Sequence, residues 1–108
     1  MISKQNYDFC SEAYIVEKTI EVVVNIADET RTIRIEALHD LNDGHYCTRS
    51  YIKETFTIQP TYPQTYGQFD RRPEESTVWI RYELPWTHRK TADDALSQAL
   101  GFLSERCR

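Results

Sequence analysis

The chain has 108 residues and a formal net charge of −4, and 40% of its residues are hydrophobic and 28% are charged. This length suffices for one hydrophobic core and excludes two independent ones. The composition is typical of a globular domain, and the mild negative charge argues against general affinity for nucleic acid without excluding a local basic patch.

Residues 1–12 are polar and show no periodic pattern, which predicts a flexible N-terminal arm ahead of a single domain over residues 13–108. The first ten residues lack the apolar run of a signal peptide, and no stretch reaches membrane-spanning length. Cys10, Cys47 and Cys107 form no closely spaced pair, which favours a reducing compartment over a disulfide framework. We therefore expect a cytoplasmic protein that does not contact membranes.

Two runs between Tyr14 and His39, in which apolar and polar residues alternate, predict a β-hairpin. The apolar positions are Val16, Ile20, Val22, Val24 and Ile26 in the first run, and Ile33, Ile35 and Ala37 in the second. The turn lacks Asn-Gly and Asp-Gly, so a four-residue loop over residues 27–30 is expected. This loop pairs Val24 with Ile33 and makes the apolar faces coincide. It also sets Glu21 opposite Glu36, a repulsion that Arg49 on the next strand would have to relieve.

A dense turn signal over Asp40 to Gly44 predicts that the chain reverses into a third strand, His45 to Gln59. In this arrangement Ile33 faces Ile52, and Glu36 faces Arg49. The inward positions are Tyr46, Ile52, Phe56 and Ile58. Glu54 has the same parity, so its carboxylate needs a partner or a place beyond the edge of the core.

Pro60 to Ser76 contains three prolines and one glycine and breaks the strand pattern. Long loops of this kind are uncommon in compact domains and are often functional or disordered. The segment has the composition of a recognition loop, with Tyr62, Tyr66, Phe69, Arg71 and Arg72. The alternative is that its aromatic residues fold back over a sheet edge. A second group of aromatic and basic residues, Trp86 with His88, Arg89 and Lys90, precedes the C-terminal segment.

Alternation resumes over Thr77 to Leu84 and predicts a fourth strand that ends at Pro85, with Val78, Ile80, Tyr82 and Leu84 inward. This strand can pair with the third strand or cross over to the first. A simple meander is favoured, because sequential strands are usually neighbours.

The pattern from Ala92 to about Arg106 predicts a helix, with Thr91 as its N-cap and Arg106 in its last turn. Its apolar stripe consists of Ala92, Ala95, Leu96, Ala99, Leu100, Leu103 and Cys107. The predicted fold is an α+β two-layer sandwich, in which one C-terminal helix covers one face of a four-stranded antiparallel sheet (ββββα).

No catalytic or cofactor motif is found. His45 and Cys47 lie two residues apart near His39, but a zinc site usually needs four ligands and the other cysteines lie at the chain ends. We therefore predict no metal and no cofactor. Cys47 activated by His39 or His45 would be the arrangement of a nucleophilic enzyme, yet no glycine-rich turn, helix N-terminus or cleft accompanies it.

The face of the sheet opposite the helix, here called the open sheet face, combines aromatic and charged residues. Its expected members are Glu21, Val23, Arg34, Glu36, Leu38, Arg49, Tyr51, Lys53, Trp79, Arg81 and Glu83. Aromatic residues among arginines suit a platform on which single-stranded nucleic acid stacks, and they equally suit a protein interface. A solvated face with cross-strand ion pairs is the third interpretation.

The leading hypothesis is a small protein-binding or regulatory module that engages a protein partner, or itself as a homodimer. The binding residues would be Arg49, Tyr51, Trp79 and Arg81 on the open sheet face and Tyr62, Tyr66, Phe69, Arg71 and Arg72 in the loop. The alternative is single-stranded nucleic-acid binding through Arg34, Arg49, Arg81, Arg71 and Arg72. An enzyme with a Cys/His site comes third.

Overall fold

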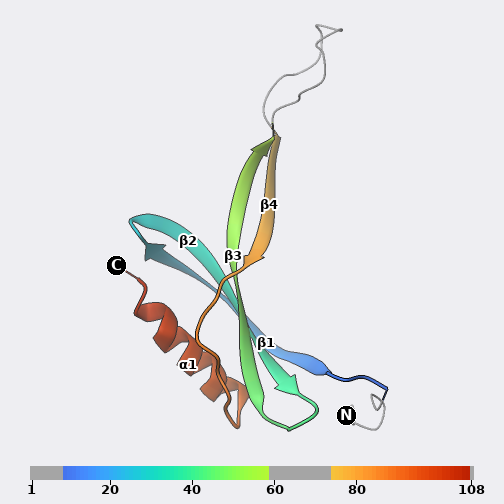
Figure 1. Ribbon diagram of the computed structural model, residues 1–108. Coiled ribbons are helices and arrows are strands. Elements are labelled where there is room, and N and C mark those ends of the chain that lie inside the picture. Colours follow the sequence, from blue (N-terminus) through green and yellow to red (C-terminus); the bar gives the residue numbers. More distant parts are fainter. Residues whose placement is uncertain (1–8, 59–73, 108) are drawn as a thin grey trace, which may run out of the picture.

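The computed structural model describes residues 9–58 and 74–107 of the chain. It contains four strands, β1 (Tyr14–Ile26), β2 (Glu29–Asp40), β3 (Tyr46–Ile58) and β4 (Glu74–Arg81), and one helix, α1 (Ala92–Ser104). The strands form a single antiparallel sheet in the order β1-β2-β3-β4, and α1 lies across one of its faces (Figure 1). The predicted ββββα fold and the meander order are both confirmed.

The β1–β2 hairpin has a shorter turn than the sequence predicted. Ile26 pairs with Glu29, so only Ala27 and Asp28 form the turn, and both have positive φ, 52° and 65°. Two such residues are the requirement of a type I′ turn, whose twist matches that of the flanking strands. The predicted four-residue loop is therefore wrong.

The shorter turn shifts the register of the hairpin by two residues. Val22 pairs with Ile33, where the prediction paired Val24 with Ile33. A shift of two keeps the same faces together, so the burial of the apolar side chains does not distinguish the two registers. The charges distinguish the two registers. Glu21 faces Arg34, with 3.1 Å between carboxylate and guanidinium, and the predicted repulsion between Glu21 and Glu36 does not arise.

A β-bulge at Glu17 changes the parity at the start of β1. The register shifts between Val16 and Lys18, and Val16 pairs with Leu38. Because Leu38 lies on the face opposite α1, Val16 lies there too, and the expectation that it shares a face with Ile20 is wrong. A bulge inserts one unpaired residue, so the alternation that held after Lys18 does not extend back through it.

The β2–β3 pairing follows the prediction, since Ile33 pairs with Ile52 and Glu36 with Arg49. Glu54, which shares the inward parity, forms an ion pair with Arg31 from β2. The Glu54 carboxylate thus has the partner that its parity requires, at the edge of the core where both side chains still reach solvent.

Helix α1 begins as predicted, because Thr91 Oγ1 accepts a hydrogen bond of 3.1 Å from the Asp94 N–H. Its buried stripe packs on β2 and β3, and the core consists of Ile33, Ile35, Ala37, Ile52, Leu96, Ala99 and Leu103. An ion pair between Lys18 and Asp93 ties β1 to the first turn of the helix. Arg106, predicted in the last turn, lies beyond the end of the helix, and its guanidinium lies over the Tyr82 ring and donates to the Glu83 carbonyl.

The β3–β4 hairpin runs past the end of the helix layer (Figure 1). Phe56, Val78 and Ile80 have the parity of the core face, but they are 49%, 39% and 42% exposed. The prediction that they are buried is wrong, because α1 is too short to cover this half of the sheet. Strand β4 also ends at Arg81, earlier than the predicted Leu84. No helix within residues 9–58 and 74–107 is long and apolar enough to cross a membrane.

Candidate functional site

One transverse row crosses all four strands on the open sheet face. In this row Glu21 of β1 pairs with Arg34 of β2, Arg34 with Tyr51 of β3, and Tyr51 with Arg81 of β4. The row begins with a carboxylate on one edge strand and ends with a guanidinium on the other. The open sheet face therefore has an acidic and a basic border within a single row.

Trp79 lies along this face instead of projecting from it. The Arg34 guanidinium carbon is 4.1 Å from the centre of the Trp79 ring, and Lys53 Nζ is 5.9 Å away. Because β2 and β4 are separated by β3, at about 4.8 Å per strand spacing, the indole must lean across β3 to meet Arg34. The cation–π contact leaves the Trp79 side chain half-buried on the open sheet face.

Three arginines of the open sheet face each have a carboxylate partner. Arg34 pairs with Glu21 at 3.1 Å, Arg49 lies 3.7 Å from Glu36, and Arg81 lies 3.7 Å from Glu83. These pairs reduce the positive potential that would attract a phosphate backbone. They are partly exposed, so each contributes on the order of 0–1 kcal/mol to folding.

The predicted site residues divide into two groups. Arg49, Tyr51, Trp79 and Arg81 all lie on the open sheet face, as the parity argument required. The loop residues lie outside the described residues: Tyr62, Tyr66, Phe69, Arg71 and Arg72.

Cys47 and His39, one of the two pairs considered for an enzyme, lie on opposite faces of the sheet. His39 pairs with Tyr46 in the sheet and therefore lies on the helix face, whereas Cys47 pairs with Leu38 on the open sheet face. The His39 ring stacks on Tyr46 at 4.6 Å. Burial raises the pKa of the Cys47 thiol above its ordinary value, and nearby Asp40 adds to this effect. Both effects disfavour the thiolate that a nucleophile requires.

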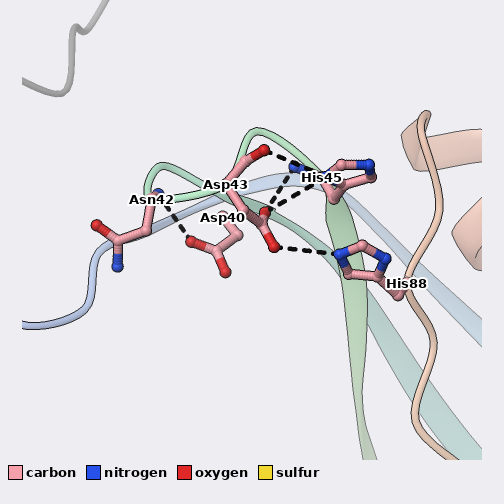
Figure 2. Close-up of polar contacts among 5 residues, drawn as sticks. All are labelled: Asp40, Asn42, Asp43, His45 and His88. Carbon is pink, nitrogen blue, oxygen red and sulfur yellow. Dashed lines mark hydrogen bonds and ion pairs between the residues drawn. The ribbon is translucent and has the colours of Figure 1, made fainter.

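A second cluster, which sequence reasoning did not assemble, consists of Asp43, His45 and His88. His88 Nε2 lies 3.1 Å from one carboxylate oxygen of Asp43, and His45 Nδ1 lies 3.7 Å from the other. Figure 2 shows both imidazoles presenting a nitrogen to this carboxylate. The two rings stack with 4.2 Å between centroids and 22° between planes, and Trp86 stacks on the outer side of His88 at 5.0 Å.

Turn chemistry holds the first two members of the cluster. The Asp43 carboxylate accepts a hydrogen bond of 2.8 Å from the His45 backbone N–H, and Asp40 caps Asn42 in the same way at 2.8 Å (Figure 2). Gly44 between them has a φ of +77°, which the reversal into β3 requires. These Asx turns fix the backbone from which the Asp43 and His45 side chains project.

Contacts on both sides of His88 hold the third member. Thr87, fully buried, shares a hydrogen bond of 2.9 Å with the Thr48 hydroxyl. Arg89 exchanges two backbone hydrogen bonds of 2.8 Å with Tyr46. His88 is thus fixed beside the start of β3, next to the turn that carries Asp43 and His45.

The cluster borders a shallow concavity of about 360 Å³, lined by His45, His88, Arg89, Lys90 and Asp94. The backbone hydrogen bond from His45 and the bond from His88 lower the pKa of the Asp43 carboxyl. Asp43 therefore stays ionised to lower pH than an isolated aspartate. The cluster combines one carboxylate and two imidazoles on an open rim, which suits the binding of a cation or a polar small molecule.

No sequence pattern indicates this cluster. In the sequence, His88 belongs to an aromatic and basic segment, and Asp43 lies in a turn. The two are 45 residues apart, and their proximity follows from the bridge between Tyr46 and Arg89. A meander that returns to the start of β3 predicts that these segments meet, but not which side chains point toward each other.

Comparison of the chain with family models, curated proteins and solved structures gives no match.

Proposed function

We propose that the protein is a protein-binding module that works as a homodimer, with the open sheet faces of two copies packed against each other. The observation that carries the proposal is the Glu21–Arg34–Tyr51–Arg81 row, which is acidic at β1 and basic at β4. Tyrosine, tryptophan and arginine are also the residues that dominate the energy of protein interfaces.

Charge complementarity favours a second copy as the partner. A twofold axis parallel to the strands would set β1 of one copy against β4 of the other. Glu21 would then face Arg81 of the partner subunit, and the same contact would recur at the opposite border. Two sheets pack well in this aligned way when their inner faces bury apolar side chains. Val23 of β1, 68% exposed on this face, supplies such a side chain.

The size of the face sets the expected strength of the dimer. Strands β1, β2 and β3 lie side by side along Tyr46–Ile52 of β3, and β4 joins them only at Tyr51 and Ile52. With about 4.8 Å between strands and about 3.4 Å per residue, the three-strand part of the face measures roughly 340 Å² in projection. A standard stable interface buries about 800 Å² per partner. We therefore expect a reversible dimer whose dissociation is measurable at micromolar concentrations.

Nucleic-acid binding is the less favoured function. The guanidinium of Arg34 covers one face of the Trp79 ring, which leaves only the other face on which a base could stack.

Analytical ultracentrifugation over about 1–200 μM, the range that brackets a micromolar dissociation constant, tests the proposal. Val23→Lys should weaken the dimer, whereas Val78→Lys, the matched change of an exposed valine on the opposite face, should leave it intact. A wild-type chain that is monomeric throughout, or a dimer lost only in the Val78 variant, overturns the assignment.

A charge exchange tests the twofold arrangement directly. Glu21→Lys and Arg81→Glu should each weaken the dimer, because each sets like charges against each other across the interface. The double variant restores both contacts and should dimerise again. Failure of the double variant to recover, with circular dichroism confirming the fold, contradicts the proposed orientation. Tight, steeply salt-dependent binding of a single-stranded oligonucleotide would favour the nucleic-acid alternative.

A further inference from the structure

We propose that Asp43, His45 and His88 form a binding site for a divalent transition-metal ion, with Zn²⁺ as the best match. The ligating atoms of the three residues all lie within 4.8 Å of one another. The site is separate from the open sheet face, and the inference does not depend on dimerisation.

The donor set selects the class of ion. Two imidazole nitrogens and one carboxylate oxygen suit zinc, nickel, cobalt, copper and iron, whereas Ca²⁺ and Mg²⁺ prefer six or more oxygen ligands. Three protein ligands are also the number found at zinc sites that keep one position open for water or substrate. At Asp43, His45 and His88 the open position would face the concavity that His45 and His88 line.

The geometry around Asp43 brings the donors together. His88 Nε2 and His45 Nδ1 approach opposite oxygens of the Asp43 carboxylate at 3.1 and 3.7 Å (Figure 2). An ion that binds at about 2.0–2.2 Å from each ligand fits among atoms spaced this closely, since two ligands on one tetrahedral ion lie about 3.4 Å apart by that bond length.

Two rearrangements accompany binding. His45 Nδ1 lies 3.2 Å from the Asp43 backbone carbonyl and must leave that contact to offer its lone pair to an ion. The lone pair of an imidazole lies in the ring plane, and the two rings are only 22° from parallel. A single ion can lie in both planes only if one ring turns about its side-chain torsions. His88 is partly exposed, so its ring has room to turn. Losing the stack against His45 lowers the affinity relative to a closed structural zinc site.

The backbone that carries the ligands is already ordered. The Asp43 turn, the buried Thr48–Thr87 hydrogen bond and the Tyr46–Arg89 bridge fix all three segments. Metal binding therefore costs little backbone entropy. In flexible segments the loss of this entropy lowers the affinity of a binding site. Arg89 and Lys90 near the rim oppose cation binding, and Asp94 offsets part of their charge.

Isothermal titration calorimetry of the untagged chain with ZnCl₂ tests the proposal. We expect one ion per chain, a higher midpoint of thermal unfolding with Zn²⁺ and no such shift with Mg²⁺. His88→Gln should lower the affinity by about tenfold or more, since it removes a direct ligand and even outer partners cost 10–100-fold. His39→Gln is the matched control, because His39 stacks on Tyr46 outside the cluster, and it should leave the affinity unchanged.

Asp43→Asn provides a second variant that is expected to fold, because the asparagine oxygen can still accept from the His45 N–H. It should also weaken binding. Co²⁺ absorption identifies the ligands: a nitrogen and oxygen site lacks the strong thiolate-to-metal band that Cys10, Cys47 or Cys107 would produce. The absence of binding, equal loss in the His39 and His88 variants, or a thiolate band overturns the proposal.

Discussion

Gly101 lowers the stability of α1, and replacing it with alanine should stabilise the protein. Gly101 lies inside the helix, and a Cβ placed there meets no atom within 4 Å. Alanine is favoured over glycine within helices by about 0.5–1 kcal/mol. With an unfolding entropy of about 2.1 cal/mol/K per residue, the 108-residue chain should gain roughly 2–4 °C in melting temperature.

Gly44 is the matched control, because a Cβ there also meets no atom within 4 Å but φ is +77°. Gly44→Ala forces an L-residue into the left-handed region and should destabilise the chain by about 1–2 kcal/mol. Urea unfolding and calorimetry of both variants measure the two effects. A loss of stability in Gly101→Ala, or no loss in Gly44→Ala, would refute the claim that backbone conformation, not packing, decides both positions.

Two further predictions concern polar groups near the open sheet face and the Asp43 cluster. Thr87→Val should lower the free energy of unfolding, measured in urea, by about 1 kcal/mol or more, because the Thr48 hydroxyl loses its hydrogen-bond partner. Adding Thr48→Val to the same chain should recover much of that loss. Equal losses in the single and double variants would contradict the pairing. Burial raises the pKa of the Cys47 thiol above its ordinary value, so Cys47 should react with iodoacetamide more slowly than free cysteine at pH 8, and its rate should keep rising in more alkaline solution. A rate that is already constant below pH 8 would show an activated thiol instead.

The contrast between Glu36–Arg49 and Glu21–Arg34 shows how far charge patterns can be followed in the sequence. Glu36 and Arg49 were matched by counting residues from a well-defined turn, and they pair in the sheet. The residue predicted opposite Glu21 is wrong, because the β1–β2 turn is two residues shorter than the predicted loop. A shift of two keeps every side chain on the same face of the sheet, so hydrophobic periodicity alone cannot correct it.

The two sites differ in how much the sequence revealed. Alternation in β2, β3 and β4 correctly placed Arg49, Tyr51, Trp79 and Arg81 on one face. It could not show that the indole leans across β3 onto Arg34, which depends on side-chain conformation. The Asp43, His45 and His88 cluster escaped prediction because its members come from two loops, and loops have no periodic pattern from which side-chain direction can be inferred.

By itself, the sequence determined the order of the elements along the chain and, after the bulge in β1, the two faces of the sheet, because periods of two and 3.6 residues record which side of each element is buried. The start of α1 was equally determined, since Thr91 and the acidic first turn act within a few residues. Tertiary structure decided the features that depend on the length of a turn or helix and on contacts between residues far apart in the chain. The two-residue turn set which charges pair, the short helix left Phe56, Val78 and Ile80 uncovered, and the bridge between Tyr46 and Arg89 brought His88 to Asp43. The local alternation of apolar residues carries no information on the length of a turn or helix, or on which remote segments pack together.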